Sequence, residues 1–258
     1  MANFNSYKKY DRSYKKGQTT PFKVSRSKIE FFIECPRCFW LDRVKAIKRP
    51  DTPPFQINKA VDELLKTEFD SYRKESKSHP WMTEHKIDAI PFAHKDLDKW
   101  RQNFVGVQAL HEPTNLLIFG AVDDIWIKPT GELIVVDYKA TSKKSEVSID
   151  ADWQITYKRQ MEVYQWLLRQ NGFKVSNKAY FVYANGISDA EGFFNKVEFK
   201  TKIIEYDGND NWIEPVLKDI KKTLEMETIP KHNATCKYCD YTGNRLELTL
   251  EHFRNQKK

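Results

Sequence analysis

The sequence predicts an α/β or α+β fold in which helices flank a central mixed sheet, in the order helix, three strands, helix, strand. Three β-rich runs follow one another between residues 104 and 140, and amphipathic helical patterns stand on both sides of them. With 258 residues, 40% of them apolar, the chain is long enough to bury a full core.

The first half of the chain is predicted to be mainly helical. Residues 1–22 are expected to form a flexible basic arm, because they are polar and rich in Lys and Arg. A helix is predicted over 26–48, ended by the proline-rich run 49–54, and an amphipathic helix over 58–75. Residues 76–103 are mixed in composition and receive no assignment.

The second half supplies the sheet and two more helices. Strands are predicted over 104–110, 116–127, 132–140, 178–184 and 193–199, with a hairpin turn at 128–131. Helices are predicted over 154–170 and 211–226, the first ended by Asn171-Gly172. The folded domain is expected to span 23–245 and to be followed by a polar tail, 246–258.

The positive charge is concentrated near the N-terminus. The chain carries a net charge of +7, and residues 1–50 hold 13 Lys and Arg against 4 Asp and Glu. Four aromatic residues lie among them: Tyr7, Tyr10, Tyr14 and Phe22. Such a segment can follow a phosphate backbone and offer rings for bases to stack on, so it favours nucleic acid as a partner. The alternative is a solvated arm that contributes only solubility.

Other classes of protein are disfavoured by what the sequence lacks. It has no apolar run of about 18 residues, and its N-terminus lacks the apolar stretch of a secretory signal, so we expect a cytoplasmic protein. It also has no G-x-x-x-x-G-K-[ST] phosphate loop of the helicase type.

Two aspartates and a lysine end neighbouring predicted strands. Asp123 ends the run 116–123, and Asp137 and Lys139 end the next run. Carboxylate oxygens hold hard divalent cations, and a lysine beside them can stabilise charge or orient a water. The pattern predicts chemistry on a phosphodiester. The alternative for Asp137 and Lys139 is a salt bridge at a strand end.

All four cysteines lie in C-x-x-C pairs, Cys35 with Cys38 and Cys236 with Cys239. In a cytosolic chain such pairs indicate metal ligands before disulfides, and two pairs can close one four-thiolate site. That site would join the N- and C-terminal segments of the domain. The alternative is two unrelated pairs of reduced thiols.

Three short motifs together resemble those of RecB-like nucleases in the PD-(D/E)XK superfamily. They are Gly120-Ala-Val-Asp123, Val136-Asp137-Tyr138-Lys139 and Gln160-Met-Glu-Val-Tyr164. Their order and spacing agree with that family, and the resemblance covers roughly residues 27–242. It implies a restriction-endonuclease-like core and a metal-dependent DNA nuclease.

The resemblance also assigns roles to single residues. Asp123, Asp137 and Asp62 would bind Mg²⁺ or Mn²⁺, and the backbone carbonyl of Tyr138 is a further candidate ligand. Asp62 stands where the family commonly has a histidine, and its alternative is an ordinary exposed helical acid. Lys139 would position the attacking water and stabilise the phosphate in the transition state.

Two helical residues and one neighbouring acid complete the predicted site. Gln160 and Tyr164 are one helical turn apart, and in the family they contact substrate or hold the lysine. Asp124 directly follows Asp123, so a strand would turn the two to opposite faces, and Asp124 is expected to be an outer ion-pair partner.

The cysteines resemble a subset of the family with an iron–sulfur site, which includes the AddB nuclease domain and the CRISPR-associated RecB-like exonucleases. That subset usually places one cysteine before the core and three after it, whereas this chain places two and two. The cofactor at the four cysteines therefore stays open between an iron–sulfur cluster and Zn²⁺.

The resemblance implies hydrolysis of DNA that is single-stranded or has free ends, by an exonuclease acting in repair, recombination or defence. The resemblance also implies helicases, recombination proteins or CRISPR proteins as partners. The alternative is a catalytically silent nucleic-acid-binding module on the same fold, but such a module would be expected to lack an acid or Lys139, and this chain has both.

Overall fold

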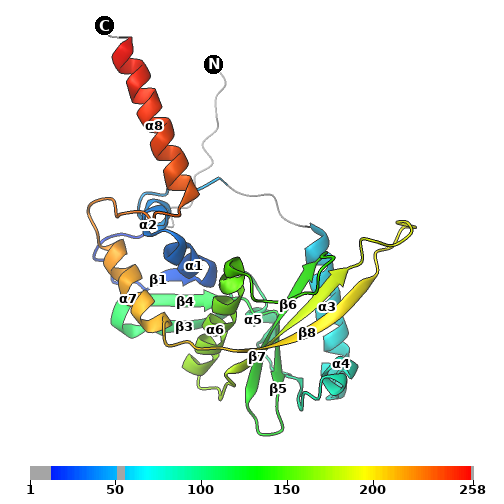
Figure 1. Ribbon diagram of the computed structural model, residues 1–258. Coiled ribbons are helices and arrows are strands. Elements are labelled where there is room, and N and C mark those ends of the chain that lie inside the picture. The colour runs from blue at the N-terminus through cyan, green and yellow to red at the C-terminus, as the bar shows by residue number, and fades with distance from the viewer. Residues whose placement is uncertain (1–12, 51–55, 257–258) are drawn as a thin grey trace, which may run out of the picture.

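The computed structural model describes residues 13–50 and 56–256, which form two sheets with helices packed around them (Figure 1). The helices are α1 (Arg26–Glu34), α2 (Pro36–Val44), α3 (Gln56–Glu75), α4 (Pro80–Glu84), α5 (Leu97–Trp100), α6 (Ile155–Gln170), α7 (Ile213–Leu224) and α8 (Lys237–Asn255). The strands are β1 (Phe22–Ser25), β2 (Ile90–Pro91), β3 (Val107–His111), β4 (Leu116–Gly120), β5 (Asp124–Ile127), β6 (Leu133–Thr141), β7 (Lys178–Gly186) and β8 (Phe199–Asp207).

The larger sheet is mixed, in the order β2-β5-β6-β7-β8, and the smaller has the order β1-β4-β3. In the larger sheet β6 and β7 run parallel, and the other neighbouring pairs are antiparallel. Helix α6 contacts strands of both sheets, β3 and β4 in one and β6 in the other, so it covers the junction between them. The predicted α/β core of a mixed sheet flanked by helices is confirmed.

The run predicted as one strand over 116–127 is divided into β4 and β5. Residues 121–123 between them belong to neither sheet. The backbone N–H of Val122 donates to the carbonyl of Trp100, and the Asp123 carboxylate accepts from the backbone N–H of Tyr138. These hydrogen bonds are not part of the regular pairing between strands. They place Asp123 at the point where the two sheets meet.

The helix predicted over 26–48 is divided in the same way, into α1 and α2. Cys35 between them is extended, with φ −163° and ψ 107°, and Pro36 is the first residue of α2. The residue before a proline is disfavoured in the helical conformation, which explains the break. The break lies at the first cysteine pair and sets the direction of its first sulfur.

The strand predicted over 193–199 is wrong. The strand that pairs with β7 is β8, which begins at Phe199. Phe194 and Asn195 have positive φ values of 42° and 58°, so the backbone turns there. Strand β8 lies at the sheet edge, and only one of its nine residues is buried. It therefore lacks the run of apolar residues by which a buried strand is recognised in a sequence.

The ends of the chain also differ from expectation. Residues 1–12 of the predicted arm lie outside the described residues, but Tyr14 is buried and packs edge-on against Phe22, with ring centroids 5.1 Å apart. These two rings are therefore unavailable for stacking on bases. The predicted tail continues helix α8, which projects away from the sheets in Figure 1.

The unassigned stretch 76–103 contains the short elements α4, β2 and α5.

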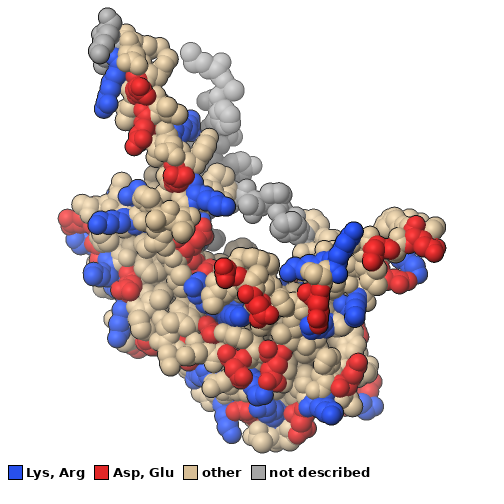
Figure 2. Space-filling view, in the orientation of Figure 1, with Lys and Arg blue, Asp and Glu red and all other residues tan. Residues whose placement is uncertain are grey.

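On the face seen in Figure 2, Lys and Arg side chains lie among Asp and Glu rather than in one positive patch. Within residues 13–50 and 56–256, no helix is both long and apolar enough to cross a membrane.

Candidate active site and cysteine cluster

Asp137 and Lys139 lie two residues apart on β6 and form an ion pair. The carboxylate of Asp137 is completely buried, and its Oδ1 accepts a hydrogen bond of 2.7 Å from Nε2 of Gln160. Its Oδ2 makes the ion pair with Lys139 and accepts no hydrogen bond from another described residue. A buried carboxylate oxygen of this kind suits a cation as partner.

Gln160 and Tyr164 project together from α6, as the spacing predicts. Nε2 of Gln160 lies 3.2 Å from the Tyr164 hydroxyl. The Tyr164 ring lies against Gly120 at the end of β4, where a Cβ atom would stand 2.6 Å from Cε1 of the ring. Glycine at this position is what allows α6 to approach the sheet junction so closely.

Asp123 is held by hydrogen bonds to both its side chain and its backbone. Its Oδ2 accepts from the backbone N–H of Tyr138 at 3.0 Å, and its backbone carbonyl accepts from Nε of Arg101 at 3.0 Å. It is thus the N–H of Tyr138 that contacts Asp123, while binding of a metal by the Tyr138 carbonyl stays a prediction. The carboxylate of Asp123 is fixed beside β6 rather than free in a loop.

Asp62 reaches the same site from α3, through a lysine that the sequence reasoning missed. Nζ of Lys66 lies 2.6 Å from Asp62 and 3.4 Å from Asp123. Lys66 follows Asp62 by four residues, a spacing at which helical side chains often pair. The sequence alone therefore did not indicate that Lys66 also reaches Asp123, which depends on where α3 packs. A cation that binds both carboxylates has to displace this ammonium.

The carboxyl groups of the site have perturbed acidity. Burial raises the pKa of Asp137 from 3.8 to about 7, with Lys139 opposing the shift and Asp123 adding to it. Burial, and then the charge of Asp123, likewise raise the pKa of Asp62. Burial alone would lower the pKa of Lys139, but Asp137 and Asp123 outweigh it, so the pKa is raised and the ammonium stays charged. Such perturbed groups gather where a protein performs chemistry.

Asp124 faces away from this site, as expected, but it is buried rather than an outer residue. Its side chain is completely buried, pairs with Arg73 and Arg101, and accepts from the Tyr138 hydroxyl at 2.7 Å. Asp70 binds both arginines as well. This network behind the site fixes β5 and the Asp123 backbone, because Arg101 contacts both.

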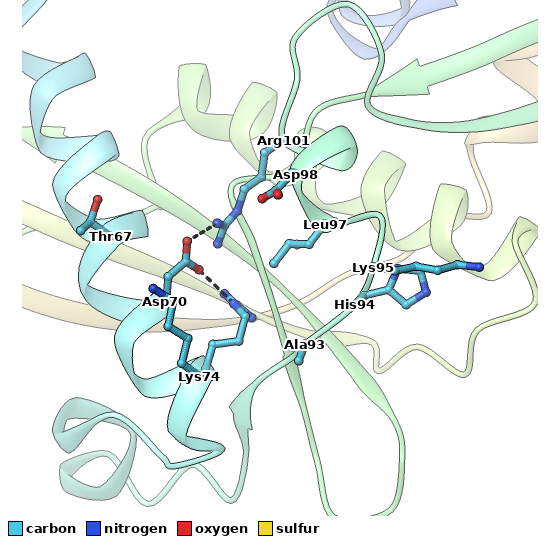
Figure 3. A pocket seen from close by; sticks show the side chains of 10 residues that line it. Thr67, Asp70, Lys74, Ala93, His94, Lys95, Leu97, Asp98 and Arg101 are labelled. Atoms are coloured by element: carbon cyan, nitrogen blue, oxygen red, sulfur yellow. Dashed lines mark hydrogen bonds and ion pairs between the residues drawn. The ribbon is translucent and has the colours of Figure 1, made fainter.

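The two arginines and Asp70 also line a cavity of about 560 Å³. Figure 3 shows the carboxylate of Asp70 pointing toward Arg101 inside it. The other residues that line it are Thr67, Lys74, Ala93, His94, Lys95, Leu97 and Asp98. None of the predicted catalytic or metal-binding residues lines this cavity, so it lies beside the site and not over it.

The predicted site residues are therefore brought together from four places. Strand β6 supplies Asp137 and Lys139, the β4–β5 junction supplies Asp123, α3 supplies Asp62, and α6 supplies the glutamine and the tyrosine. Oxygen donors of this type fit Mg²⁺ or Mn²⁺, and the Lys139 ammonium is the one partner of Asp137 Oδ2 among the described residues. The three aspartates are candidate ligands of a divalent ion.

The four cysteines meet in one buried cluster, although about 200 residues separate the pairs. The Sγ atoms of Cys38 and Cys239 are 3.4 Å apart, those of Cys35 and Cys239 are 3.7 Å apart, and those of Cys38 and Cys236 are 3.7 Å apart. All four Sγ atoms lie within 4.8 Å of one another. We call these residues the cysteine cluster, and their convergence fits a bound metal.

Neighbouring donors favour the thiolate at Cys35, whereas burial raises the pKa of Cys38 and of Cys239. Nη2 of Arg49 lies 3.3 Å from Sγ of Cys236. Burial would raise the pKa of Cys35, but backbone N–H groups at Cys38 and Asn233 lower it to about 7. Metal ligands must be deprotonated, so Cys35 is prepared for a cation, while Cys38 and Cys239 would release their protons on binding one.

A family model described as the PD-(D/E)XK nuclease superfamily matches residues 23–243. The chain belongs to this superfamily, which implies a metal-dependent nuclease. No curated protein matches the chain.

A solved structure described as "Crystal structure of SSO0001" is 16% identical to the chain. The match covers 85% of this chain and 84% of that one, with a TM-score of 0.37, which is too low to carry an argument. The clustered cysteines agree with the cysteine-containing subset that the sequence resembles.

Proposed function

We propose that the chain hydrolyses phosphodiester bonds of DNA at the acidic centre, as an exonuclease on single strands or free ends. The observation that carries the proposal is the connected set of Asp123, Asp137 and Lys139, with Gln160 holding the buried carboxylate. The family supports nuclease chemistry. The DNA substrate and a role in repair, recombination or defence with partner proteins are parts of the proposal.

Each residue of the centre has a distinct task. Asp62, Asp123 and Asp137 would hold Mg²⁺ or Mn²⁺, which when bound polarises the phosphate and activates water. Lys139 positions the attacking water and stabilises the charge that develops on the phosphate. Gln160 donates to Asp137 and keeps its Oδ2 directed at the lysine.

We propose further that the cysteine cluster binds one Zn²⁺ ion rather than an iron–sulfur cluster. Zn–S bonds of about 2.3 Å in a tetrahedron place the sulfurs about 3.8 Å apart. Three of the six sulfur pairs are 3.4–3.7 Å apart and all six lie within 4.8 Å, close to that value. A cluster of several irons distributes its thiolates over separate metal atoms and holds them farther apart. Metal analysis should find one zinc per chain, and iron with acid-labile sulfide would overturn the assignment.

The nuclease proposal is tested by cleavage of end-labelled single- and double-stranded DNA with Mg²⁺, with Mn²⁺ and with chelator. Wild type should cut with either metal and not with chelator. Asp123→Asn should lose most of this activity, while the exposed residue Asp189 gives a matched control, Asp189→Asn, that should cut like wild type. Tight DNA binding by a wild type that never cuts would favour a silent binding module instead.

A further inference from the structure

Two aromatic rings lead from Lys139 to the surface. The Lys139 ammonium lies 4.6 Å from the centre of the Tyr157 ring. The Trp153 ring meets Tyr157 edge to face, with centroids 5.4 Å apart. Trp153 is 55% exposed, so a large flat apolar ring faces solvent two contacts away from the acidic centre.

The turn that carries Trp153 is fixed by hydrogen bonds. Trp153 lies in the 3₁₀ turn Asp152–Gln154, and the last residue of this turn, Gln154, is buried. The Gln154 side chain accepts from the backbone N–H of Ala151 at 3.0 Å and donates to the carbonyl of Ser148 at 2.8 Å. The Thr156 hydroxyl donates to the carbonyl of Trp153 at 3.1 Å. An exposed ring on a fixed backbone loses little freedom when a ligand packs on it.

A lysine borders this ring on the segment that follows β6. Nζ of Lys143 lies 5.8 Å from the Trp153 ring centre. The backbone of Lys143 is itself fixed, because its N–H donates to Asn185 at 2.8 Å and its carbonyl accepts from Asn185 at 3.0 Å. Lys144, the next residue, is exposed. A ring beside positive side chains is the combination that binds single-stranded nucleic acid.

We propose that Trp153 stacks on a base of single-stranded DNA whose neighbouring phosphate lies at Lys139, with Lys143 close to the backbone. The proposal rests on the proposed nuclease function and names how its substrate is held. Every base has a flat face, so the contact is independent of sequence. In a duplex those faces are covered by neighbouring bases, so the contact selects single strands.

The test compares two ligands with one backbone, a short oligothymidylate and the same sugar–phosphate chain without bases. Affinities are measured by fluorescence anisotropy with chelator present, so that nothing is cut. Trp153→Ala should weaken binding of the oligothymidylate by about tenfold, and Trp153→Phe should lose much less because a ring remains. Neither variant should change binding of the base-free chain.

Phe253 offers a matched control, since it is 56% exposed on α8, and Phe253→Ala should bind both ligands like wild type. Equal weakening of both ligands by Trp153→Ala, or no weakening of either, would overturn the stacking proposal. Cleavage is followed in parallel with Mg²⁺ and Mn²⁺. A wild type that does not cut contradicts the nuclease function, and the binding ratios still decide the role of Trp153.

Discussion

The acidic centre and the cysteine cluster are both candidate metal sites, but their donors are arranged differently. The four thiols converge within 4.8 Å of one another, and they are buried. The carboxylates of the acidic centre instead have protein partners, Lys66 between Asp62 and Asp123, and Lys139 on Asp137. Among the described residues, only the cysteines form a group of His, Cys, Asp or Glu donors so close together.

The difference separates a structural site from a reactive one. A closed set of four ligands leaves no position for substrate, and it joins segments from the two ends of the domain. In the acidic centre the carboxylate oxygens pair with lysines. A metal ion or a substrate can replace these lysines during a reaction, because the ion pairs are not part of a closed set of ligands. The comparison predicts that damage to the first site lowers stability and damage to the second lowers cleavage.

The largest effect is expected from the cysteine cluster. Cys239→Ser should lose the bound metal and several kcal/mol of stability, because binding at a structural site contributes directly to folding, by about 10 kcal/mol in small domains. Thermal unfolding and metal analysis measure this, and cleavage should fall only as folded protein is lost. A metal-free Cys239→Ser protein with the melting temperature of wild type would contradict the structural role.

Asp137→Asn should give the opposite result. Cleavage with Mg²⁺ should fall by about 10³-fold or more, because a divalent ion loses a charged ligand, while the fold and any metal at the cysteine cluster are kept. The amide oxygen can still accept the Gln160 hydrogen bond, although the ion pair with Lys139 is lost, and thermal unfolding with chelator checks that the variant is folded. Retained cleavage at the wild-type rate would remove Asp137 from the site.

The raised pKa of Asp137 predicts how the metal-free protein responds to pH. Its pKa rises from 3.8 to about 7 on folding, so the folded state binds this proton more tightly than the unfolded chain. This carboxyl therefore destabilises the fold increasingly as pH rises from about 4 to about 7, by a few kcal/mol in all. Urea unfolding with chelator should show Asp137→Asn gaining stability over wild type through that window. A difference that does not change with pH would contradict this account.

The smallest effect is expected at Lys66. Its ammonium competes with a divalent ion for Asp62 and Asp123, so Lys66→Met should bind Mn²⁺ about tenfold more tightly. Lys59 on the same helix pairs with Glu63 at an exposed position, which makes Lys59→Met a matched control with unchanged affinity. Calorimetric titration measures both, and weaker binding by Lys66→Met would show that the lysine supports the metal site.

Much of this comparison was predictable from the sequence. Strand alternation places Asp137 and Lys139 on one face, and paired cysteines indicate one shared site. The same rule predicts opposite faces for Asp123 and Asp124, but Asp123 lies between the strands β4 and β5. These predictions depend only on local geometry and on ligand chemistry, which short motifs carry.

The missed features depend on how elements dock. Lys66 matters because α3 lies against β6, and Arg101 because the loop before β3 contacts Asp123. Trp153 matters because α6 packs on β6 and brings the neighbouring Tyr157 ring over Lys139. Helix α8 and strand β8 were missed for another reason, since neither buries the apolar stripe that a pattern detects.

The central claim is that Lys139 performs chemistry while the aspartates hold metal, and one measurement tests it most directly. Single-turnover cleavage of end-labelled single-stranded DNA is compared for wild type and Lys139→Ala, with Mn²⁺ and DNA affinities measured on the same samples. The account predicts a loss of about 10²–10³-fold in rate. Mn²⁺ affinity should not fall, because the ammonium that pairs with Asp137 is removed, and DNA affinity should fall by much less than the rate. Equal rates for the two proteins would contradict it.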